Sequence, residues 1–312
     1  MAQSTITTGK EARTSRVSFE QSRTMYAWFF LVPTLFIIAV IAIYPLFQTF
    51  WLSFTSTRIN VDRPASFVGF DNFINLFGDS DFQSALVITL AFTVITVFFE
   101  FVLGMVVALV LNANFRGRGV MRAVMLIPWA LPTVISTKIW AWMYNDNYGV
   151  FTDMFRRIGI IKPNDNFAFL STTNGTPFAM GIVSVIDIWK TTPYMALLLL
   201  AGLQLVPDDI YEAARVDGAN RIQQFFQITL PLLRPSIAVA LIFRTLDAVR
   251  VFDLFYALFG DRPDVQTVAT FAQNKLVNQS RVGYGSAVCV ILFIIIAIFV
   301  AVYVRTFKIE EA

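Results

Sequence analysis

The chain has 312 residues, of which 56% are hydrophobic, 15% are aromatic and only 14% are charged, a composition too apolar for a soluble domain of this size. It contains no histidine and one cysteine, Cys289 within an apolar run, which excludes a histidine metal site, a histidine proton relay and an internal disulfide. The net charge of +3 is small, so nothing indicates nucleic-acid binding, and the sequence instead predicts a polytopic membrane protein.

Residues 1–25 are predicted to form a cytoplasmic N-terminal tail, and residues 26–312 to form one transmembrane domain. A helix needs roughly 20 apolar residues to cross a bilayer, because backbone groups in lipid must be hydrogen-bonded within the segment. Six segments reach this length, so the predicted fold class is all-α with six transmembrane helices. These segments run about Tyr26–Trp51, Ser84–Asn112, Val120–Met143, Pro177–Leu203, Leu232–Tyr256 and Tyr284–Arg305.

Prolines interrupt three of these spans. Pro128 and Pro132 lie in the third span, Pro193 lies in the fourth, and Pro231 and Pro235 open the fifth. Since proline lacks a backbone N–H, each is expected to bend or break its helix. A bend at Pro193, which stands among charged residues, would open a cavity, whereas the alternative is a set of kinks that serve only packing.

Charged residues lie within the spans, where an ionised group costs at least about 2.5–3.5 kcal/mol to insert and therefore marks a functional candidate. In the fourth span, the 100° helical period places Asp187, Thr191 and Tyr194 on one face, with Lys190 on its flank. Glu100, in the second span, is expected to pack against another helix or another subunit. The fourth span thus predicts one wall of a substrate pathway.

The fifth span carries a second charged face. By the same helical period, the residues that share it are Arg244, Asp247, Ala248 and Val251. Arg250 and Asp253 rotate away from this face and are expected to brace the helix or to lie near the outer surface. The alternative to a pathway is a set of neutralising pairs three residues apart, Asp187 with Lys190 and Asp247 with Arg244 or Arg250.

The polar loop 204–231, between the fourth and fifth spans, predicts two short helices joined by a sharp turn. Pro207 is suited to enter the first helix, and Asp208 and Asp209 favour its positive N-terminal end. Gly218 can adopt a positive φ and so end that helix. The residues expected to form a compact surface for a partner's groove are Glu212, Ala213, Ala214, Asp217 and Gly218.

Topology follows from the basic residues. With six spans both termini lie on one side, and that side holds the larger share of Lys and Arg, concentrated near the span ends. Such loops remain in the cytoplasm, so both termini and the loop 204–231 are predicted to be cytoplasmic.

Several kinds of activity lack their motifs. The sequence contains no G-x-x-x-x-G-K-[ST] phosphate loop, no G-x-S-x-G elbow and, without histidine, no Ser-His-Asp triad. No duplication marks two inverted halves within the chain. We therefore expect no catalytic residue, metal or cofactor on this chain, and a transport subunit that needs a second membrane subunit.

The loop pattern E-A-A-x3-G-x9-I-x-L-P, from Glu212 to Pro231, resembles the coupling loop of permease subunits in binding-protein-dependent ABC importers. The strings W-K-T-T-P at 189–193 and F-R-T-L-D-A at 243–248 are similar to those of the carbohydrate class, and especially of trehalose-type permeases. The resemblance covers about Ala27 to Lys308. It departs at Gly260-Asp261-Arg262-Pro263, where such families often carry a glycine pair before the proline.

This resemblance implies the type I importer permease fold in a bacterial or archaeal inner membrane. The chain would form half of the pathway for a di- or oligosaccharide of the maltose or trehalose kind. The implied partners are a second, homologous permease in a heterodimer, two ATPase subunits that hold ATP and Mg, and an extracytoplasmic sugar-binding protein.

Two other function classes remain. An autonomous secondary transporter or channel would use Asp187 or Asp247 for proton coupling, which leaves the Glu212 loop unexplained. An intramembrane enzyme would need a converging nucleophile and base, and only acid–amine pairs are present.

Overall fold

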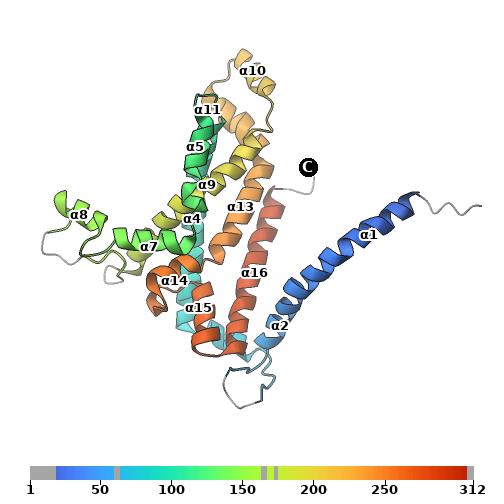
Figure 1. Ribbon diagram of the computed structural model, residues 1–312, viewed down its shortest axis with the longest axis vertical. Helices are drawn as coiled ribbons and strands as arrows, with labels where there is room; N and C mark the ends of the chain where they lie inside the picture. Colours follow the sequence, from blue (N-terminus) through green and yellow to red (C-terminus); the bar gives the residue numbers. More distant parts are fainter. Residues whose placement is uncertain (1–18, 60–63, 163–166, 172–174, 308–312) are drawn as a thin grey trace, which may run out of the picture. The chain divides into compact units, whose positions relative to one another are not determined.

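The structure is a computed structural model that describes residues 19–59, 64–162, 167–171 and 175–307 (Figure 1). Within these ranges the chain is helical or irregular, and its one ladder-type contact is an isolated bridge between Thr55 and Phe67. The prediction of an all-α fold is confirmed. Four helices of the described part are long and apolar enough to cross a membrane, and the number is up to six if each of two bent pairs counts as one span.

The first of two compact units, residues 1–49, contains most of the first span. Its helical elements are α1 (Phe19–Ile38), a π-helical turn η1 (Ala39–Ile43) and α2 (Tyr44–Ser53), of which the last residues belong to the next unit. The helix begins at Phe19, so the last part of the predicted 1–25 tail is helical, and residues 1–18 lie outside the described ranges. The most apolar window of this span has no buried residue, as suits a helix surrounded by lipid or by another chain.

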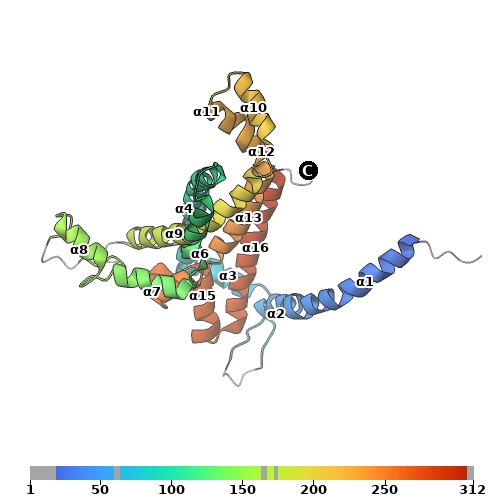
Figure 2. The ribbon, with the colours of Figure 1, turned by 45° about the horizontal axis from the view of Figure 1, so that its top comes forward.

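The second unit, residues 50–312, holds the other spans. Its first elements are α3 (Asp71–Phe77), α4 (Ser80–Asn112), α5 (Arg118–Met125), α6 (Ile127–Ala130), α7 (Thr133–Met143), α8 (Val150–Arg157) and α9 (Thr176–Leu203). Its later elements are α10 (Asp208–Val216), α11 (Arg221–Gln224), η3 (Phe225–Thr229), α12 (Leu230–Leu232), α13 (Arg234–Val249), α14 (Asp253–Phe259), η4 (Pro263–Val265), α15 (Val268–Gln273), η5 (Asn274–Asn278) and α16 (Val282–Phe307). Helices α10 and α11 lie at the opposite end of this unit from α15 in both ribbon views (Figures 1 and 2).

The centre of the second unit is the packing of α4 on α9, with α13 against both. Two glycines permit close approach. A Cβ at Gly104 of α4 would lie 2.7 Å from Cγ of Met195 on α9, and a Cβ at Gly202 would lie 2.9 Å from Cδ2 of Leu233. Small residues at such crossings allow membrane helices to gain dispersion energy without a hydrophobic driving force. The result is a rigid three-helix base for the charged residues within the spans.

The third and fifth spans are broken, as their prolines predicted. The third bends by 86° between Ala130 and Thr133, where Pro132 is the N-terminal cap of α7. The fifth bends by 68° at Leu233, just before Pro235. The fourth span differs from the prediction, because α9 continues through Pro193 without interruption. Its extensive contact with α4 holds the helix together despite the missing hydrogen bond at the proline.

Candidate functional site

A buried ionic cluster joins α4, α9 and α13. The guanidinium of Arg244 donates from Nε and Nη2 to the two carboxylate oxygens of Glu100, and from Nη2 to Oδ2 of Asp187. Its Nη1 donates to Oδ2 of Asp247 at 3.2 Å. Glu100 is 0% exposed and Arg244 1%, so both charges have exchanged water for each other and for these neighbours. A fork of donors that binds carboxylates on three helices fixes the relative positions of those helices.

Thr191 extends this cluster. Its hydroxyl lies 2.5 Å from Oε1 of Glu100 and 2.6 Å from the backbone oxygen of Asp187. Each oxygen of the Glu100 carboxylate therefore has a donor, as a charge in a dry site requires. The sequence predicted only that Glu100 packs against another helix or another subunit. Its direct part in the charged site was missed, although a lone carboxylate in mid-span was a signal for it.

Lys190 donates hydrogen bonds to backbone carbonyl groups at the break in the third span and forms no salt bridge with Asp187. Its Nζ donates to the backbone oxygen of Leu131 at 2.8 Å and to that of Trp129 at 3.4 Å. These carbonyls stand at the end of α6, where the chain breaks and no further turn supplies N–H groups. The alternative pairing of Asp187 with Lys190 is thus wrong, while the alternative pair of Arg244 with Asp247 is present.

A cavity of about 260 Å³ lies beside this cluster, where α7 begins and α13 ends. The residues that line it are Thr133, Asp187, Lys190, Thr191, Arg244, Asp247, Arg250, Val251, Phe252, Asp253 and Leu254. The side chain of Asp247 is 62% exposed, so one carboxylate of the cluster is open to the cavity while Arg244 stays behind it. The cavity combines hydrogen-bond acceptors, donors and apolar surface at the break of the third span and at the interruption between α13 and α14. This arrangement is suited to binding a polar solute.

The helical period of the fifth span was applied beyond the residue at which its helix ends. Helix α13 ends at Val249, so Val251 cannot share a helix face with Arg244, although it lines the same cavity. Arg250 and Asp253, which were expected to brace the helix or to lie near the outer surface, are exposed and line the cavity as well. The reason is that the chain leaves the helix at Arg250 and begins α14 at Asp253, which re-aims all three side chains.

Two other predicted pathway residues, Tyr194 and Ala248, are not among the residues that line this cavity. Ala248 is buried in α13. Tyr194 is half-buried and stacks on Trp129, with ring centroids 5.4 Å apart and ring planes 8° from parallel. This stack places an aromatic pair from α9 and α6 next to the carbonyls that Lys190 binds.

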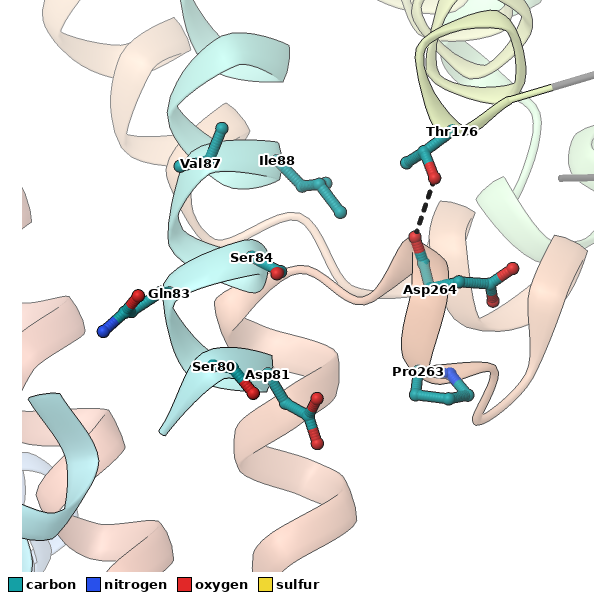
Figure 3. Close-up of a pocket in the computed structure, with 9 residues that line it drawn as sticks. All are labelled: Ser80, Asp81, Gln83, Ser84, Val87, Ile88, Thr176, Pro263 and Asp264. Atoms are coloured by element: carbon teal, nitrogen blue, oxygen red, sulfur yellow. Dashed lines mark hydrogen bonds between the residues drawn. The ribbon is translucent and has the colours of Figure 1, made fainter. Parts of the chain in front are cut away.

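A larger, open cavity of about 790 Å³ lies where α4 and α9 begin (Figure 3). Its lining mixes polar, acidic and apolar residues and consists of Ser80, Asp81, Gln83, Ser84, Val87, Ile88, Thr176, Pro263 and Asp264. The hydroxyl of Thr176 donates to the backbone oxygen of Asp264 at 3.4 Å and ties α9 to the segment after the atypical Gly260–Pro263 stretch. None of the residues predicted from the sequence to be functional lines this cavity.

The loop 204–231 forms the predicted helical hairpin. Pro207 is the N-terminal cap of α10, which begins at Asp208, and Gly218 has a φ of 81° just after the helix ends. Asn220 and Gln223 cap the start of α11 through reciprocal hydrogen bonds. The hydroxyls of Tyr211 and Thr229 lie 3.0 Å apart and fasten α10 to the entrance of the fifth span.

The hairpin presents a surface that nothing in the described chain covers. Glu212, Ala213, Asp217 and Gly218 are exposed, and Ala214 is half-buried. The sequence did not single out the apolar residues that surround them, of which Val216 is 88% exposed. The others are Leu205, Ile210, Ile222 and Phe226. An exposed apolar patch around a charged, small-residue helix is typical of a protein-binding surface.

Comparisons with known proteins agree with this architecture. The trehalose/maltose transport system permease protein MalF of Thermococcus litoralis is 39% identical over 294 residues, which cover 94% of this chain and 96% of the relative. The trehalose transport system permease protein SugA of Mycobacterium tuberculosis is 33% identical over 293 residues, covering 94% and 92%.

A solved structure shows the same fold. The crystal structure of a bacterial ABC transporter involved in the import of the acidic polysaccharide alginate contains a chain that matches with a TM-score of 0.79. The match covers 94% of this chain and 98% of the other at 22% identity, so it establishes the type I importer permease fold and nothing finer. Residues 100–307 match the family described as binding-protein-dependent transport system inner membrane component. The chain therefore belongs to this family of inner-membrane permease subunits.

Proposed function

We propose that the chain is a permease subunit of an ATP-driven importer for a neutral di- or oligosaccharide, and that it forms half of the translocation pathway. The observation that carries the proposal is the cavity of about 260 Å³ beside the Arg244 cluster, between the break of the third span and the interruption that separates α13 from α14. The names of the relatives from Thermococcus litoralis and Mycobacterium tuberculosis, which refer to trehalose and maltose, support the substrate class.

The cavity residues divide the work of binding a sugar. The carboxylates of Asp187 and Asp247 accept hydrogen bonds from sugar hydroxyls, and Thr191 can both donate and accept. Arg244 orients both carboxylates, and its positive charge between them reduces their mutual repulsion. Val251 adds apolar surface. Tyr194 and Ala248 lie outside this lining, where Tyr194 holds Trp129 in place.

The hairpin couples this pathway to ATP hydrolysis. Glu212, Ala213 and Ala214 of α10, with Asp217 and Gly218 at its end, would fit a groove on an ATPase subunit that holds ATP and Mg. The bond between Tyr211 and Thr229 would carry movement of α10 to η3 and the fifth span. ATP must favour the outward-open state over the inward-open one, since a ligand shifts an equilibrium only by its differential affinity.

The complete transporter would contain this chain, a homologous but distinct second permease and two ATPase subunits. A sugar-binding protein would dock at the extracytoplasmic face, and both termini of this chain would be cytoplasmic. Two membrane subunits are needed because this chain supplies one hairpin and one cluster, and a two-fold ATPase needs a similar face across the axis.

Uptake into proteoliposomes tests the proposal. Radiolabelled maltose or trehalose is offered to vesicles that contain this chain alone, and to vesicles that contain the co-purified complex with internal ATP and external binding protein. We expect accumulation only with the complex and ATP. Uptake by the chain alone, driven by a proton gradient, would instead establish a secondary transporter.

A further inference from the structure

Helix α8, between the third and fourth spans, carries an outward-facing apolar surface that the proposed transport function does not use. Val150, Met154 and Ile158 recur every four residues, so they share one face of the helix, and all three are exposed. Ile160, just beyond the helix, is exposed as well. No described residue covers this face.

The opposite face fixes α8 to the core and thereby fixes the direction of the exposed face. Phe151 stacks on Tyr144 with ring centroids 4.6 Å apart, and Phe155 stacks on Phe169 at 5.7 Å. Thr152 is fully buried, and its hydroxyl donates to the backbone oxygen of Asn145 at 2.9 Å. Helix α8 therefore cannot rotate to bury Val150, Met154 and Ile158 without breaking this packing.

A charged edge lies beside the apolar face. Asp153 and Arg157 form an exposed salt bridge of 2.8 Å on the side of the helix next to Val150. Arg156 reaches back to the backbone oxygen of Asp146 at 3.4 Å, and Lys162 is exposed after the helix. Around the helix, the face that packs on the core is thus followed by the exposed apolar face and then by the exposed charged edge.

This order of faces is that of an interfacial membrane helix, which has one face in lipid and one in water. Two further observations favour lipid over a protein partner. The apolar face follows within seven residues of Met143, where the membrane helix α7 ends, so a lipid contact of α7 would extend onto it. Trp142 and Tyr148, which flank that end, are both exposed, as aromatic residues of the interfacial belt are.

We propose that α8 lies in the membrane–water interface of the leaflet at which α7 ends. Val150, Met154 and Ile158 would contact the upper acyl chains of phospholipids. Arg157 and Lys162 have long side chains whose charged ends can reach lipid phosphates while their stems remain in the apolar zone. Because α8 is joined to the core through Phe151 and Phe155, the interface would hold the outer half of the bent third span at a set depth.

Site-directed fluorescence tests this placement. Cys289, the only cysteine, is replaced by serine, and bimane is attached at Met154→Cys or Ile158→Cys. Asp153→Cys, one residue away on the charged edge, is the matched control. The complex is reconstituted in vesicles of phosphatidylcholine and phosphatidylglycerol and quenched with nitroxide-labelled lipid or with neutral acrylamide. We expect severalfold stronger lipid quenching and a blue-shifted emission at positions 154 and 158, and acrylamide quenching at 153.

A second variant separates the lipid contact from a docking site for the binding protein. Met154→Asp combined with Ile158→Asp should bring a label at Val150→Cys into water, whereas Asp153→Asn should leave that label in lipid. Equal acrylamide quenching at 153, 154 and 158 in the absence of binding protein would overturn the proposal. Protection of position 154 that arises only when the binding protein is added would also overturn it, and would assign α8 to that protein.

Discussion

Arg244 shows how one side chain can define a site within the membrane. It is shared by Glu100, Asp187 and Asp247, which lie on three different helices or turns of the same unit. The two carboxylates that face the core differ from Asp247, which is 62% exposed. The cluster therefore contains an inner part that holds helices together and an outer part that is available to a solute.

The two parts should separate by mutation. Arg244→Met leaves Glu100 and Asp187 buried without their cation, and breaking such a pair costs about 3–5 kcal/mol. Asp247→Asn removes an exposed partner, whose pairing contributes about 1 kcal/mol or less. We expect Arg244→Met to lower thermal stability in detergent strongly, and Asp247→Asn to keep stability while it reduces sugar uptake. Unchanged uptake in Asp247→Asn would remove Asp247 from the pathway.

This cluster also marks where sequence reasoning ends. The helical period placed Asp187 on one face of the fourth span and Arg244 with Asp247 on one face of the fifth, and the structure brings the three side chains together. The helical period could not assign Glu100 to Arg244, because the two are 144 residues apart and local periodicity carries no information on which helices meet. The same limit explains why the only partner that the sequence offered for Lys190, in the alternative of neutralising pairs, was the nearby Asp187, and not the backbone carbonyl of Leu131.

Lysines at broken helix ends provide a prediction with an internal control. Lys190 Nζ binds the carbonyl of Leu131 in a partly buried site, and Lys138 Nζ binds the carbonyl of Ala257 at 2.7 Å in an exposed one. An unsatisfied buried acceptor costs about 1–3 kcal/mol, whereas water replaces an exposed donor. Lys190→Met should therefore lower the melting temperature in detergent more than Lys138→Met does. Equal losses would mean that the break is held by other contacts.

At the scale of elements, the bent spans and the hairpin are what the sequence predicted best. Proline and glycine act on the local backbone. Pro132 and Gly218 therefore predicted a helix break and a turn without any information on which helices pack together. Pro193 misled because the packing of α9 on α4 overrides its local effect. No proline or glycine marks the end of α13 at Val249. The helical period was therefore extended past this end, to Val251.

The hairpin turn allows a test that isolates backbone geometry. Gly218 has a φ of 81°, and a Cβ there would meet no atom within 4 Å, so only conformational strain opposes a side chain. Valine is a poor fit to positive φ, whereas asparagine tolerates it. We expect Gly218→Val to insert normally but to lose uptake and sugar-stimulated ATP hydrolysis, and Gly218→Asn to keep most of both. Full coupling in Gly218→Val would exclude the hairpin as the transmitting element.

The surface of α10 allows a complementary test of charge. The side chain of Glu212 is 69% exposed, and its distance to Arg215 is 3.8 Å, so the pair contributes little to folding. Glu212→Lys should leave the melting temperature unchanged. We nevertheless expect it to abolish ATP-driven uptake, because a reversed charge on the exposed surface of α10 weakens the docking of this helix to the ATPase. Wild-type uptake would show that Glu212 does not face the partner.

At the scale of the whole molecule, the chain has an apolar surface that its own described residues leave exposed. The hairpin of the second unit carries an exposed apolar patch that no described residue of this unit covers. We expect the intact complex to contain one copy of this 35.2 kDa chain, one different permease and two ATPase chains. Native mass measurement of the detergent-solubilised complex checks this composition. Two copies of this chain without another permease would contradict the heterodimer.

The link from Glu100 to Arg244 also has a consequence for how the protein is made. Synthesis proceeds from the N-terminus, so α4 enters the bilayer when its arginine partner, 144 residues later, does not yet exist. A mid-span carboxylate without a counter-ion makes that insertion costly. We therefore expect α4 to gain its full stability in lipid only when α13 arrives. The ionic cluster would then link the stability of the second span to the completion of the fifth.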